Sequence, residues 1–357
     1  MSIKKVADIA GVSIATVSRF INNPNKVKEE TRHKVEEAIR QIQYRPNSLA
    51  QNFRRGQCGL IVVIVRHIGD PMYHCLTNSI SQVAHNNGYD VFIKEVQDKN
   101  LSLEQYQNMV DSKQADGFIT LVGLPQSDKH DAARLKKLPL VLAGEPSPTD
   151  TTVALSTISI NNYKAATDAT EHLLSLGHQH IVFMTHAGES ITHIKRKEGF
   201  LGAIAKRNSS TSTLHGDVNN EQNDSHYTDS IIHIDNLPSS MEKAIQQLAQ
   251  FNPRTTALVC VDDDIAIEAL TAAKKQGLKI PQDLSIIGFN NIRYAEKTDP
   301  PLTTIGQPMS DIGEHAMATL HQMIKNKQQN QTNNTSNIVL EHRVIIRSST
   351  CPPSFNQ

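Results

Sequence analysis

The chain of 357 residues is long enough for two or three domains, each with a hydrophobic core of its own. Its 36 Lys and Arg balance 36 Asp and Glu, yet residues 1–60 hold 11 of the basic residues against 5 acidic ones, as expected for a nucleic-acid-binding head on a body that stays off nucleic acid. The four cysteines are scattered, no apolar run could span a membrane and the start of the chain has no signal-peptide pattern. These features argue against a disulfide framework, a zinc site or a membrane anchor, so we expect a cytoplasmic protein.

Two short helices joined by a tight turn are predicted at the start of the chain. Residues 3–22 read IKKVADIAGVSIATVSRFIN, in which apolar residues recur at helical spacing before and after the interruption at residues 11–13. This helix-turn-helix spacing is typical of domains that place their second helix in the major groove of DNA, although an ordinary helical hairpin shares it. The inward-facing residues are expected to be Val6, Ile9, Ala10, Val17, Phe20 and Ile21.

The outward side chains of the second helix are of the kinds that contact DNA. Ile14 and Ala15 are apolar groups that suit thymine methyls. Thr16 and Ser18 carry hydroxyls that suit phosphates, and Arg19 carries a guanidinium that suits guanine. An arginine bidentate to guanine contributes about 1–3 kcal/mol of discrimination, so Arg19 is expected to matter most for sequence specificity.

A third helix and a short basic segment are predicted next. The helix covers about 29–42, where the apolar residues fall on one face at a spacing of three or four. The basic segment, residues 47–57 (NSLAQNFRRGQ), is too short to be a stable helix alone in water. It is expected to be either a hinge that folds on DNA or a plain linker.

Beyond residue 58, apolar strands alternate with helical patterns. Strands are predicted at 59–65, 89–95, 116–122, 138–144, 180–185, 256–261 and 284–289, and helices near 74–87, 102–113, 162–176, 192–207 and 263–276. Continuous apolar strands joined by helices indicate parallel sheets covered on both faces, and two such series indicate two doubly wound subdomains with a ligand site between them. The stretches 208–230 and 326–337 are too polar for a core and are expected to be surface insertions.

The sequence gives little support for an enzyme or for a metal site. The chain has no GxGxxG after a strand, no P-loop, no GxSxG and no HExxH, so neither an enzyme nor a bound cofactor is expected. The acidic run 262–264 precedes a predicted helix, which favours helix capping over a metal site. His178 and His180 straddle a predicted turn, and structural roles are favoured for both over metal binding.

The chain resembles the LacI/GalR family of bacterial transcriptional repressors over nearly its full length. The motifs that carry the resemblance are VADIAGVSIATVSRFINNPNKV, YRPN (44–47), GDPMY (69–73), ADGFITL (115–121), SLGHQHI (175–181), IPQD (280–283), LSIIGFNN (284–291) and DPPLTTIGQP (299–308). Several of them are nearest to cytidine-responsive members of the family. The resemblance implies an all-α helix-turn-helix head and an α/β body made of two doubly wound parallel-sheet subdomains of periplasmic-binding-protein type.

The family's organisation implies boundaries for each part of the chain. These are a helix-turn-helix domain at 1–46, a hinge at 47–57, an effector-binding and dimerisation domain at 58–346 and a tail at 347–357. Within the body, the N-subdomain is expected at about 58–160 and 291–320, and the C-subdomain at about 161–290 and 321–346. The tail has no apolar heptads, so a homodimer is expected rather than a tail-zippered tetramer.

The resemblance also implies how the protein binds double-stranded DNA. Two paired heads would contact a near-palindromic operator, and Phe53 of each hinge would enter the minor groove as an apolar wedge that kinks the operator. The residues that fall on base-reading positions are Ile14, Ala15 and Arg19. Those that fall on phosphate positions are Thr16, Ser18 and Asn22, and those in the hinge are Asn47, Ala50, Phe53 and Arg54.

A small ligand, a nucleoside or a purine-like molecule, is implied to bind between the subdomains and to change operator affinity. The positions implied to bind it are Met72, Tyr73, Asn161, Arg196, Asn236 and Asn290. The chain departs from the family at three of them, since the family usually has Asp where Asn290 stands, often Asp at Asn161 and often an aromatic residue near Asn236. A carboxylate only accepts hydrogen bonds, whereas an amide also donates them.

Two further expectations concern partners and an alternative function. Resemblance to the cytidine-responsive members implies a second DNA-bound regulator, the cAMP receptor protein, as a partner. The alternative from another functional class is a ligand-blind DNA-binding co-regulator in which the altered cleft is vestigial. Stabilisation by a ligand would separate the two functions, because a ligand that binds the folded state raises its stability.

Overall fold

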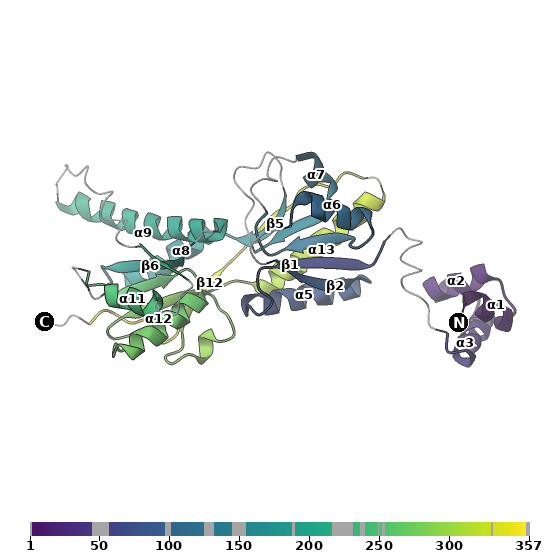
Figure 1. Cartoon of the computed structure of the whole chain (residues 1–357), viewed down its shortest axis with the longest axis horizontal. Helices are drawn as coiled ribbons and strands as arrows, with labels where there is room; N and C mark the ends of the chain where they lie inside the picture. The colour runs from purple at the N-terminus through teal and green to yellow at the C-terminus, as the bar shows by residue number, and fades with distance from the viewer. Residues whose placement is uncertain are drawn as a thin grey trace. The chain divides into compact units, whose positions relative to one another are not determined.

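The protein divides into two compact units, Met1–Gly59 and Leu60–Gln357, which we call the head and the body. Figure 1 traces each unit along the colour scale from purple to yellow. The computed structural model describes residues 2–44, 57–96, 101–124, 132–144, 155–187, 190–215, 231–235, 240–248, 250–251, 254–329 and 331–354.

The head is helical, as the sequence predicts. Gly11 ends the first helix in the left-handed conformation, with a φ of +64°, and its N–H donates to the carbonyl of Ala7. Ser13 then caps the second helix, so the chain reverses within three residues. The elements of the head are α1 (Ile3–Ala10), α2 (Ile14–Asn22), a 3-10 turn (Pro24–Lys26) and α3 (Glu29–Gln41).

A small apolar core holds these helices together. Its buried members are Val6, Ala7, Ala10, Val17, Phe20, Val35, Ala38 and Ile42. The prediction that Ile9 faces inward is wrong, because its side chain is 41% exposed. Ala7 completes the buried stripe of α1 with Val6 and Ala10, and Ile9 lies about 100° around the helix from Ala10.

The first lobe of the body, the N-lobe, is a parallel sheet covered by helices. The strand order is β11-β5-β4-β3-β1-β2, and every neighbouring pair is parallel. The strands are β1 (Leu60–Val65), β2 (Asp90–Glu95), β3 (Gly117–Thr120), β4 (Leu140–Ala143), β5 (Ser156–Ile160) and β11 (Asn337–Leu340). The helices are α5 (Met72–Asn86), α6 (Leu103–Asp111), α7 (Ala132–Lys137) and α13 (Met309–Gln328).

Strand β1 shows why its sequence is apolar without alternation. Ile61, Val63 and Val65 belong to the core shared with α5 and α13, whereas Val62 and Ile64 belong to the core shared with α6 and α7. All five side chains are at most 1% exposed. Successive side chains of a strand point to opposite faces, so burial on both faces requires an unbroken apolar run. Figure 1 shows α6 and α7 on one side of this sheet and α5 on the other.

The second lobe, the C-lobe, repeats the architecture. Its strand order is β12-β10-β9-β8-β6-β7, in which only β12 runs antiparallel to its neighbour among the described strands. The strands are β6 (Ile181–His186), β7 (Ile231–Ile234), β8 (Ala257–Cys260), β9 (Ser285–Asn290), β10 (Thr303–Gly306) and β12 (Arg343–Ile345). The helices are α8 (Asn162–Ser175), α9 (Ile191–His215), α11 (Ser240–Leu248), α12 (Asp263–Lys275) and a 3-10 turn (Ala295–Lys297). Two doubly wound lobes are therefore confirmed.

The described chain passes between the lobes after β5, after β10 and after β11, which corrects the expected lobe boundaries. Residues 303–306 lie in the C-lobe sheet, whereas the family resemblance implies the N-subdomain for 291–320. Residues 337–340 lie in the N-lobe sheet, whereas the resemblance implies the C-subdomain for 321–346. Partners in a sheet are neighbours in space, and the order of elements along the chain does not reveal them.

The polar stretches and the tail are described in part, and the described residues of the two polar stretches are exposed or partly exposed wherever their burial is described. Helix α9 continues to His215 and so takes in the start of the stretch 208–230, whose residues 216–230 lie outside the described residues. Residues 326–328 end α13, and Asn337 begins β11. In the tail, Ser349 is fully buried and its hydroxyl donates to the carbonyl of Ile286 over 2.6 Å. The first part of the tail is therefore packed into the C-lobe.

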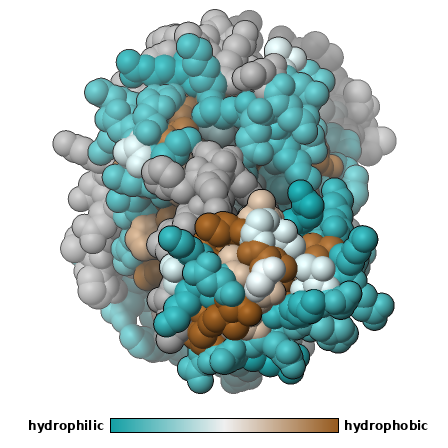
Figure 2. All heavy atoms as spheres, turned by 90° about the vertical axis from the view of Figure 1, so that its right-hand side faces the viewer, coloured by the Kyte–Doolittle hydropathy of each residue, from teal (hydrophilic) through white to brown (hydrophobic). Residues whose placement is uncertain are grey.

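Figure 2 shows a largely hydrophilic surface that apolar side chains reach in places. The large apolar or aromatic side chains that are exposed in the described residues are Ile9, Ile14, Ile68, Phe92, Tyr163, Tyr294, Val339 and Ile346. None of the described helices combines the length and the apolar character needed to cross a membrane.

Candidate functional site

Helix α2 presents the predicted base-reading residues to solvent. The side chains of Ile14, Ala15 and Arg19 are all exposed, and that of Ile14 is 45% exposed. On the opposite face, Val17 and Phe20 are buried in the head core and fix the helix against α1 and α3. The sequence pattern therefore separates the outward face from the inward face correctly along this helix.

The start of α2 is stabilised by a hydroxyl cap. The Ser13 hydroxyl accepts a hydrogen bond from the Thr16 backbone N–H over 3.1 Å and lies 2.9 Å from the Thr16 hydroxyl. Thr16 was predicted to contact phosphate, and here its hydroxyl is engaged with Ser13. Ser18 is partly exposed on the same helix, and Asn22 is the last residue of α2.

The predicted hinge contacts cannot be placed in the same way. Asn47, Ala50, Phe53 and Arg54 lie outside the described residues, so the minor-groove role of Phe53 stays a prediction.

A cavity of about 330 Å³ lies between the two lobes of the body. Met72 and Tyr73, at the start of α5, line it from the N-lobe, and Asn290, at the end of β9, lines it from the C-lobe. The structure thus brings together three of the residues predicted to bind a ligand. Further described residues on its wall include Ile68, Asp70, Asn291, Arg293, Tyr294 and Met309.

Arg196 lies behind this wall and is held by the protein itself. Its guanidinium donates to the Asn162 Oδ1 over 3.0 Å, to the Val261 carbonyl over 2.6 Å and to the Asn290 Oδ1 over 3.3 Å. It also lies 3.6 Å from the centre of the Phe289 ring, a cation–π contact. Arg196 is only 3% exposed, and its side chain links α9 to α8, to the residue after β8 and to the end of β9.

Asn290 links Arg196 to the cavity, because it bonds to Arg196 and lines the cavity. Its Oδ1 accepts from Arg196 and, over 2.7 Å, from the Gln307 Nε2. The residue has a φ of +106° and is 8% exposed, so its position is set by the backbone and by both donors. The two bonds use the amide oxygen, and the amide nitrogen is the donor group that a carboxylate at this position would not have.

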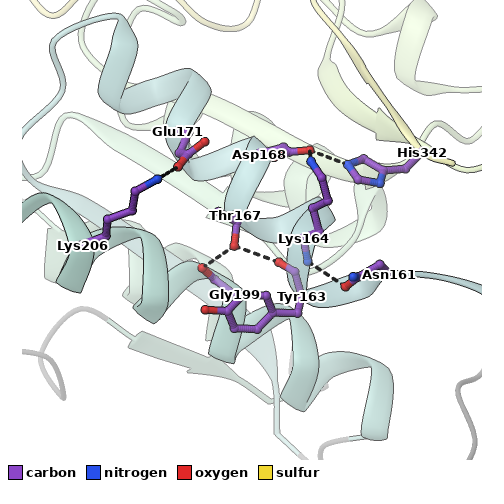
Figure 3. Close-up of polar contacts among 9 residues, drawn as sticks. All are labelled: Asn161, Tyr163, Lys164, Thr167, Asp168, Glu171, Gly199, Lys206 and His342. Carbon is purple, nitrogen blue, oxygen red and sulfur yellow. Dashed lines mark hydrogen bonds and ion pairs between the residues drawn. The ribbon is translucent and has the colours of Figure 1, made fainter.

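Asn161 has a different place from the one predicted. Its side chain caps α8 by accepting from the Lys164 N–H over 2.9 Å, and it is not among the described residues that line the cavity. Figure 3 shows Asn161 at the start of α8, about two turns before Asp168, whose carboxylate is 2.8 Å from the His342 Nε2. Asn236 lies outside the described residues.

Asp70 and Tyr294 also line the cavity, and neither is among the positions predicted to bind a ligand. Asp70 belongs to the motif GDPMY, and Tyr294 follows the motif GFNN by three residues, so position next to a motif was the available signal. Burial raises the pKa of the Asp70 carboxyl, and nearby Asp262 adds to the increase. Its carboxylate accepts from the Met72 N–H over 2.8 Å, which fixes the start of α5 at the cavity.

The acidic run before α12 caps the helix, as predicted. Asp262 accepts from the Ile265 N–H over 2.8 Å and pairs with the His186 Nε2 over 3.0 Å. This hydrogen bond is the main reason that the pKa of His186 is raised. Asp263 is fully buried, and burial raises its pKa to about 7 while its carboxylate accepts from Thr304 and from the Ile292 N–H.

The predicted structural role of His178 is also observed. Its ring lies 2.9 Å from the Thr256 hydroxyl and 2.9 Å from the Cys351 carbonyl, and the residue is 2% exposed. Burial lowers the pKa of this histidine, which favours the neutral ring. In the described ranges, no group of three or more His, Cys, Asp or Glu is placed to hold a metal ion.

Comparison with known proteins agrees with this architecture. The model for bacterial regulatory proteins of the lacI family matches residues 2–47, and the model for a periplasmic binding protein-like domain matches residues 170–350. The chain is 34% identical over 349 residues to the HTH-type transcriptional repressor CytR of Escherichia coli K12, covering 98% of this chain and 96% of that protein. It is 32% identical over 354 residues to the catabolite control protein A of Priestia megaterium, covering 98% and 99%.

The fold has counterparts among solved structures. The crystal structure of the lac repressor dimer bound to operator and the anti-inducer ONPF superposes with a TM-score of 0.74 at 22% identity, covering 98% of this chain and 99% of that chain. With 34% identity to CytR over nearly the whole of both chains, the protein belongs to the LacI family of bacterial regulatory proteins, which are DNA-binding transcriptional regulators with an effector-binding domain and not enzymes.

Proposed function

We propose that this protein is a transcriptional repressor whose affinity for its operator is set by a small ligand in the cavity between the lobes. The observation that carries the proposal is that Met72 and Tyr73 of one lobe and Asn290 of the other line a single cavity of about 330 Å³. A ligand that touches both lobes favours one relative arrangement of them, and such a shift needs only a difference in affinity between the arrangements. The relative CytR is named a transcriptional repressor, which supports repression and not activation as the effect of operator binding.

The ligand that we propose is a nucleoside or a purine-like molecule. Met72, Tyr73 and Tyr294 supply apolar and aromatic surface suited to a planar ring. The amide nitrogen of Asn290 suits an acceptor on that ring, since the amide oxygen is used by Arg196 and Gln307. We assign Arg196 the role of positioning Asn290, because it is buried and bonded to three protein groups.

The assembly that we propose is a homodimer bound to a near-palindromic operator in the bacterial cytoplasm. Phe92 is 53% exposed and lies on β2 at the edge of the N-lobe sheet. Large exposed apolar side chains of this kind favour a protein interface. The lac repressor, solved as a dimer on its operator, supports the same arrangement. Partnership with the cAMP receptor protein stays a prediction.

Fluorescence anisotropy on an operator selected from random DNA tests the proposal. The full chain is titrated at fixed salt, because phosphate contacts make affinity salt-dependent, with and without a panel of nucleosides, purine bases and sugars. We expect one nucleoside or purine to shift the operator Kd and to raise the melting temperature. Tight operator binding that no panel member alters, together with an unchanged melting temperature, would contradict the proposal and favour the ligand-blind co-regulator.

Two variants show whether the responsive ligand uses this cavity. Tyr294→Ala removes an exposed aromatic side chain from the cavity wall and is expected to weaken ligand affinity about three- to tenfold. Ile346→Ala removes a comparably exposed side chain that is not among the residues lining the cavity, and it should leave ligand affinity unchanged. Equal effects of the two variants would place the ligand elsewhere.

A further inference from the structure

The C-lobe contributes the consecutive residues 290–294 to the cavity wall, and we call them the wall loop. The loop starts at the last residue of β9 with two residues at positive φ, Asn290 at +106° and Asn291 at +54°. Residues other than glycine adopt this region of backbone conformation at a cost in free energy, so the surrounding structure must hold the backbone there.

Arg347 links the two ends of the connection from β9 to β10. Its guanidinium donates to the Asn291 Oδ1 and to the Leu302 carbonyl, each over 2.7 Å. Asn291 directly follows β9 and Leu302 directly precedes β10, so one side chain bonds to both ends of the segment that contains the wall loop. Arg347 itself is not among the described residues that line the cavity.

The chemistry of the two side chains fixes the orientation of the Asn291 amide. A guanidinium only donates hydrogen bonds, so the amide oxygen must face Arg347, and the amide nitrogen is the opposite end of the group. The planar guanidinium carries several donors in fixed directions, which lets it serve both acceptors at once, whereas the single ammonium of lysine has no such geometry. Arg347 therefore sets both the position and the orientation of a side chain that lines the cavity.

The first residues of the tail fix the backbone from which this guanidinium extends. The Arg347 N–H donates to the Thr303 hydroxyl over 3.0 Å. Two residues later, the fully buried Ser349 donates its hydroxyl to the Ile286 carbonyl over 2.6 Å and accepts from the Thr303 N–H over 2.8 Å. Because these bonds join the tail to β9 and β10, the arginine has a fixed starting point beside the strands that carry the wall loop.

We infer that Arg347 is a positioning residue of the ligand site, which holds the wall loop in its binding geometry through Asn291 without contacting the ligand. The inference rests on the proposed function, since it takes this cavity as the ligand site. It gives the tail a task in ligand binding. It also assigns the Asn291 amide nitrogen as a donor to the ligand, suited to a carbonyl oxygen or a ring nitrogen of a base.

Motion of the wall loop can be measured without any ligand. Tyr294→Trp places a single tryptophan on the loop, because the chain has none of its own. Time-resolved fluorescence anisotropy then reports the nanosecond motion of this side chain, and we expect Arg347→Gln to raise the amplitude of the fast component about twofold. The matched control is Arg343→Gln, which removes an exposed arginine from β12 and should leave the decay unchanged.

A second variant keeps the test decisive if Arg347→Gln unfolds the body, which its melting temperature would reveal. Arg347→Lys retains the positive charge but not the planar set of donors, so it should loosen the wall loop in the same direction.

Variants of Asn291 show whether Arg347 acts through this residue. Asn291→Ala removes the acceptor and should loosen the loop as much as Arg347→Gln does, and the double variant should be no looser than either single one. Asn291→Asp keeps an oxygen for the guanidinium and should restrain the loop as the wild-type residue does. A merely structural role of Arg347 would instead give additive effects and no difference between alanine and aspartate at this position.

Ligand affinity is measured by calorimetric titration of the full chain with cytidine and adenosine as probes. We expect Arg347→Gln and Asn291→Ala each to weaken binding of the responsive probe about three- to tenfold, which is the effect of one lost hydrogen bond, while Arg343→Gln leaves it unchanged.

Two results would overturn the inference. One is equal motion of the wall loop in Arg347→Gln and in Arg343→Gln, and the other is an additive effect of Arg347→Gln and Asn291→Ala on the motion. Both are read without ligand, so they stand whether or not a probe binds. Failure of every nucleoside, purine and sugar of the panel to bind the wild-type chain would instead contradict the proposed function.

Discussion

Arg196 shows how a residue that sequence reasoning places in a ligand site can serve the protein instead. Its partners Asn162, Val261 and Asn290 lie 34, 65 and 94 residues away along the chain. The motif IKRKEGF marks the position of the arginine but says nothing about these partners. The guanidinium makes three hydrogen bonds to protein groups and contacts the ring of Phe289. These protein groups occupy the positions from which a ligand would otherwise bind the guanidinium.

At the same scale, the His186–Asp262 pair predicts a pH-dependent stability. The pKa of His186 is raised chiefly by its hydrogen bond to Asp262, with Asp262, Glu268 and Asp264 adding attraction. Burial works to raise the pKa of Asp262, but the hydrogen bond and the charge of His186 leave it below its usual value. The contribution of His186 is therefore fully present below pH 6.5, its ordinary pKa, and is lost as pH rises through the raised value.

We expect His186→Gln to lower the free energy of unfolding by about 1 kcal/mol at pH 6, a modest loss because the side chain is 34% exposed. The difference from wild type should shrink by pH 9, where the histidine is neutral. It should also shrink when pH falls below the range in which Asp262 is ionised. Urea unfolding at several pH values measures this, with His233→Gln on β7 as an exposed control. An equal loss at pH 6 and pH 9 would contradict the assignment.

At the scale of elements, long apolar strands and regular helices were predictable, whereas short or polar elements were not. Strand β1 is buried on both faces and is unmistakable in the sequence. Strand β10 reads TTIG and is just as fully buried for three of its four residues, yet it is short, polar and flanked by Pro301 and Pro308, so no apolar run marks it. These threonines are paired inside the C-lobe, where the Thr304 hydroxyl donates to Asp263. A buried polar residue is acceptable only with its partner, and the partner is 41 residues away.

The contact between α8 and α9 depends on glycine. A Cβ added at Gly199 would overlap the Tyr163 carbonyl oxygen, and Thr167 donates to the Gly199 carbonyl over 3.1 Å, as Figure 3 shows. We expect Gly199→Ala to lower the free energy of unfolding of the body by about 1–3 kcal/mol, since an overpacked contact must shift backbone. Gly69→Ala is the matched control, because nothing lies within 4 Å of a Cβ there. Chemical unfolding of both variants distinguishes the two sites, and equal stability would refute the close-packing argument.

At the scale of the whole molecule, charge separates the two units. Residues 1–60 hold 11 basic against 5 acidic residues in a chain whose net charge is zero, so the body carries the balancing negative charge. An acidic body is repelled by DNA while the head is attracted, which orients the protein during association.

This separation predicts that operator binding depends on salt and that ligand binding does not. Operator affinity should fall about tenfold or more when salt rises from about 50 to 200 mM, because the basic head releases counterions from the DNA backbone. Ligand binding in the body should change little over the same range if the ligand is an uncharged nucleoside. Anisotropy titrations and ligand-induced melting shifts measure the two responses separately. An operator Kd that does not change with salt concentration would show that the basic side chains of the head do not contact the DNA phosphates.

The helix-turn-helix, the apolar strands of two doubly wound lobes and the outward face of α2 can all be predicted from the amino-acid sequence. These features follow from local periodicity and capping, which residues a few positions apart decide. Two features became visible only in the tertiary arrangement of the sheets: β10 joins the C-lobe and β11 joins the N-lobe. The same holds for three side chains: Ile9 is exposed, Asn161 caps α8, and Arg196 is buried and hydrogen-bonded to other parts of the protein. Each of these depends on which distant segments meet in space, and burial and pairing energies between such segments leave no periodic trace in the chain.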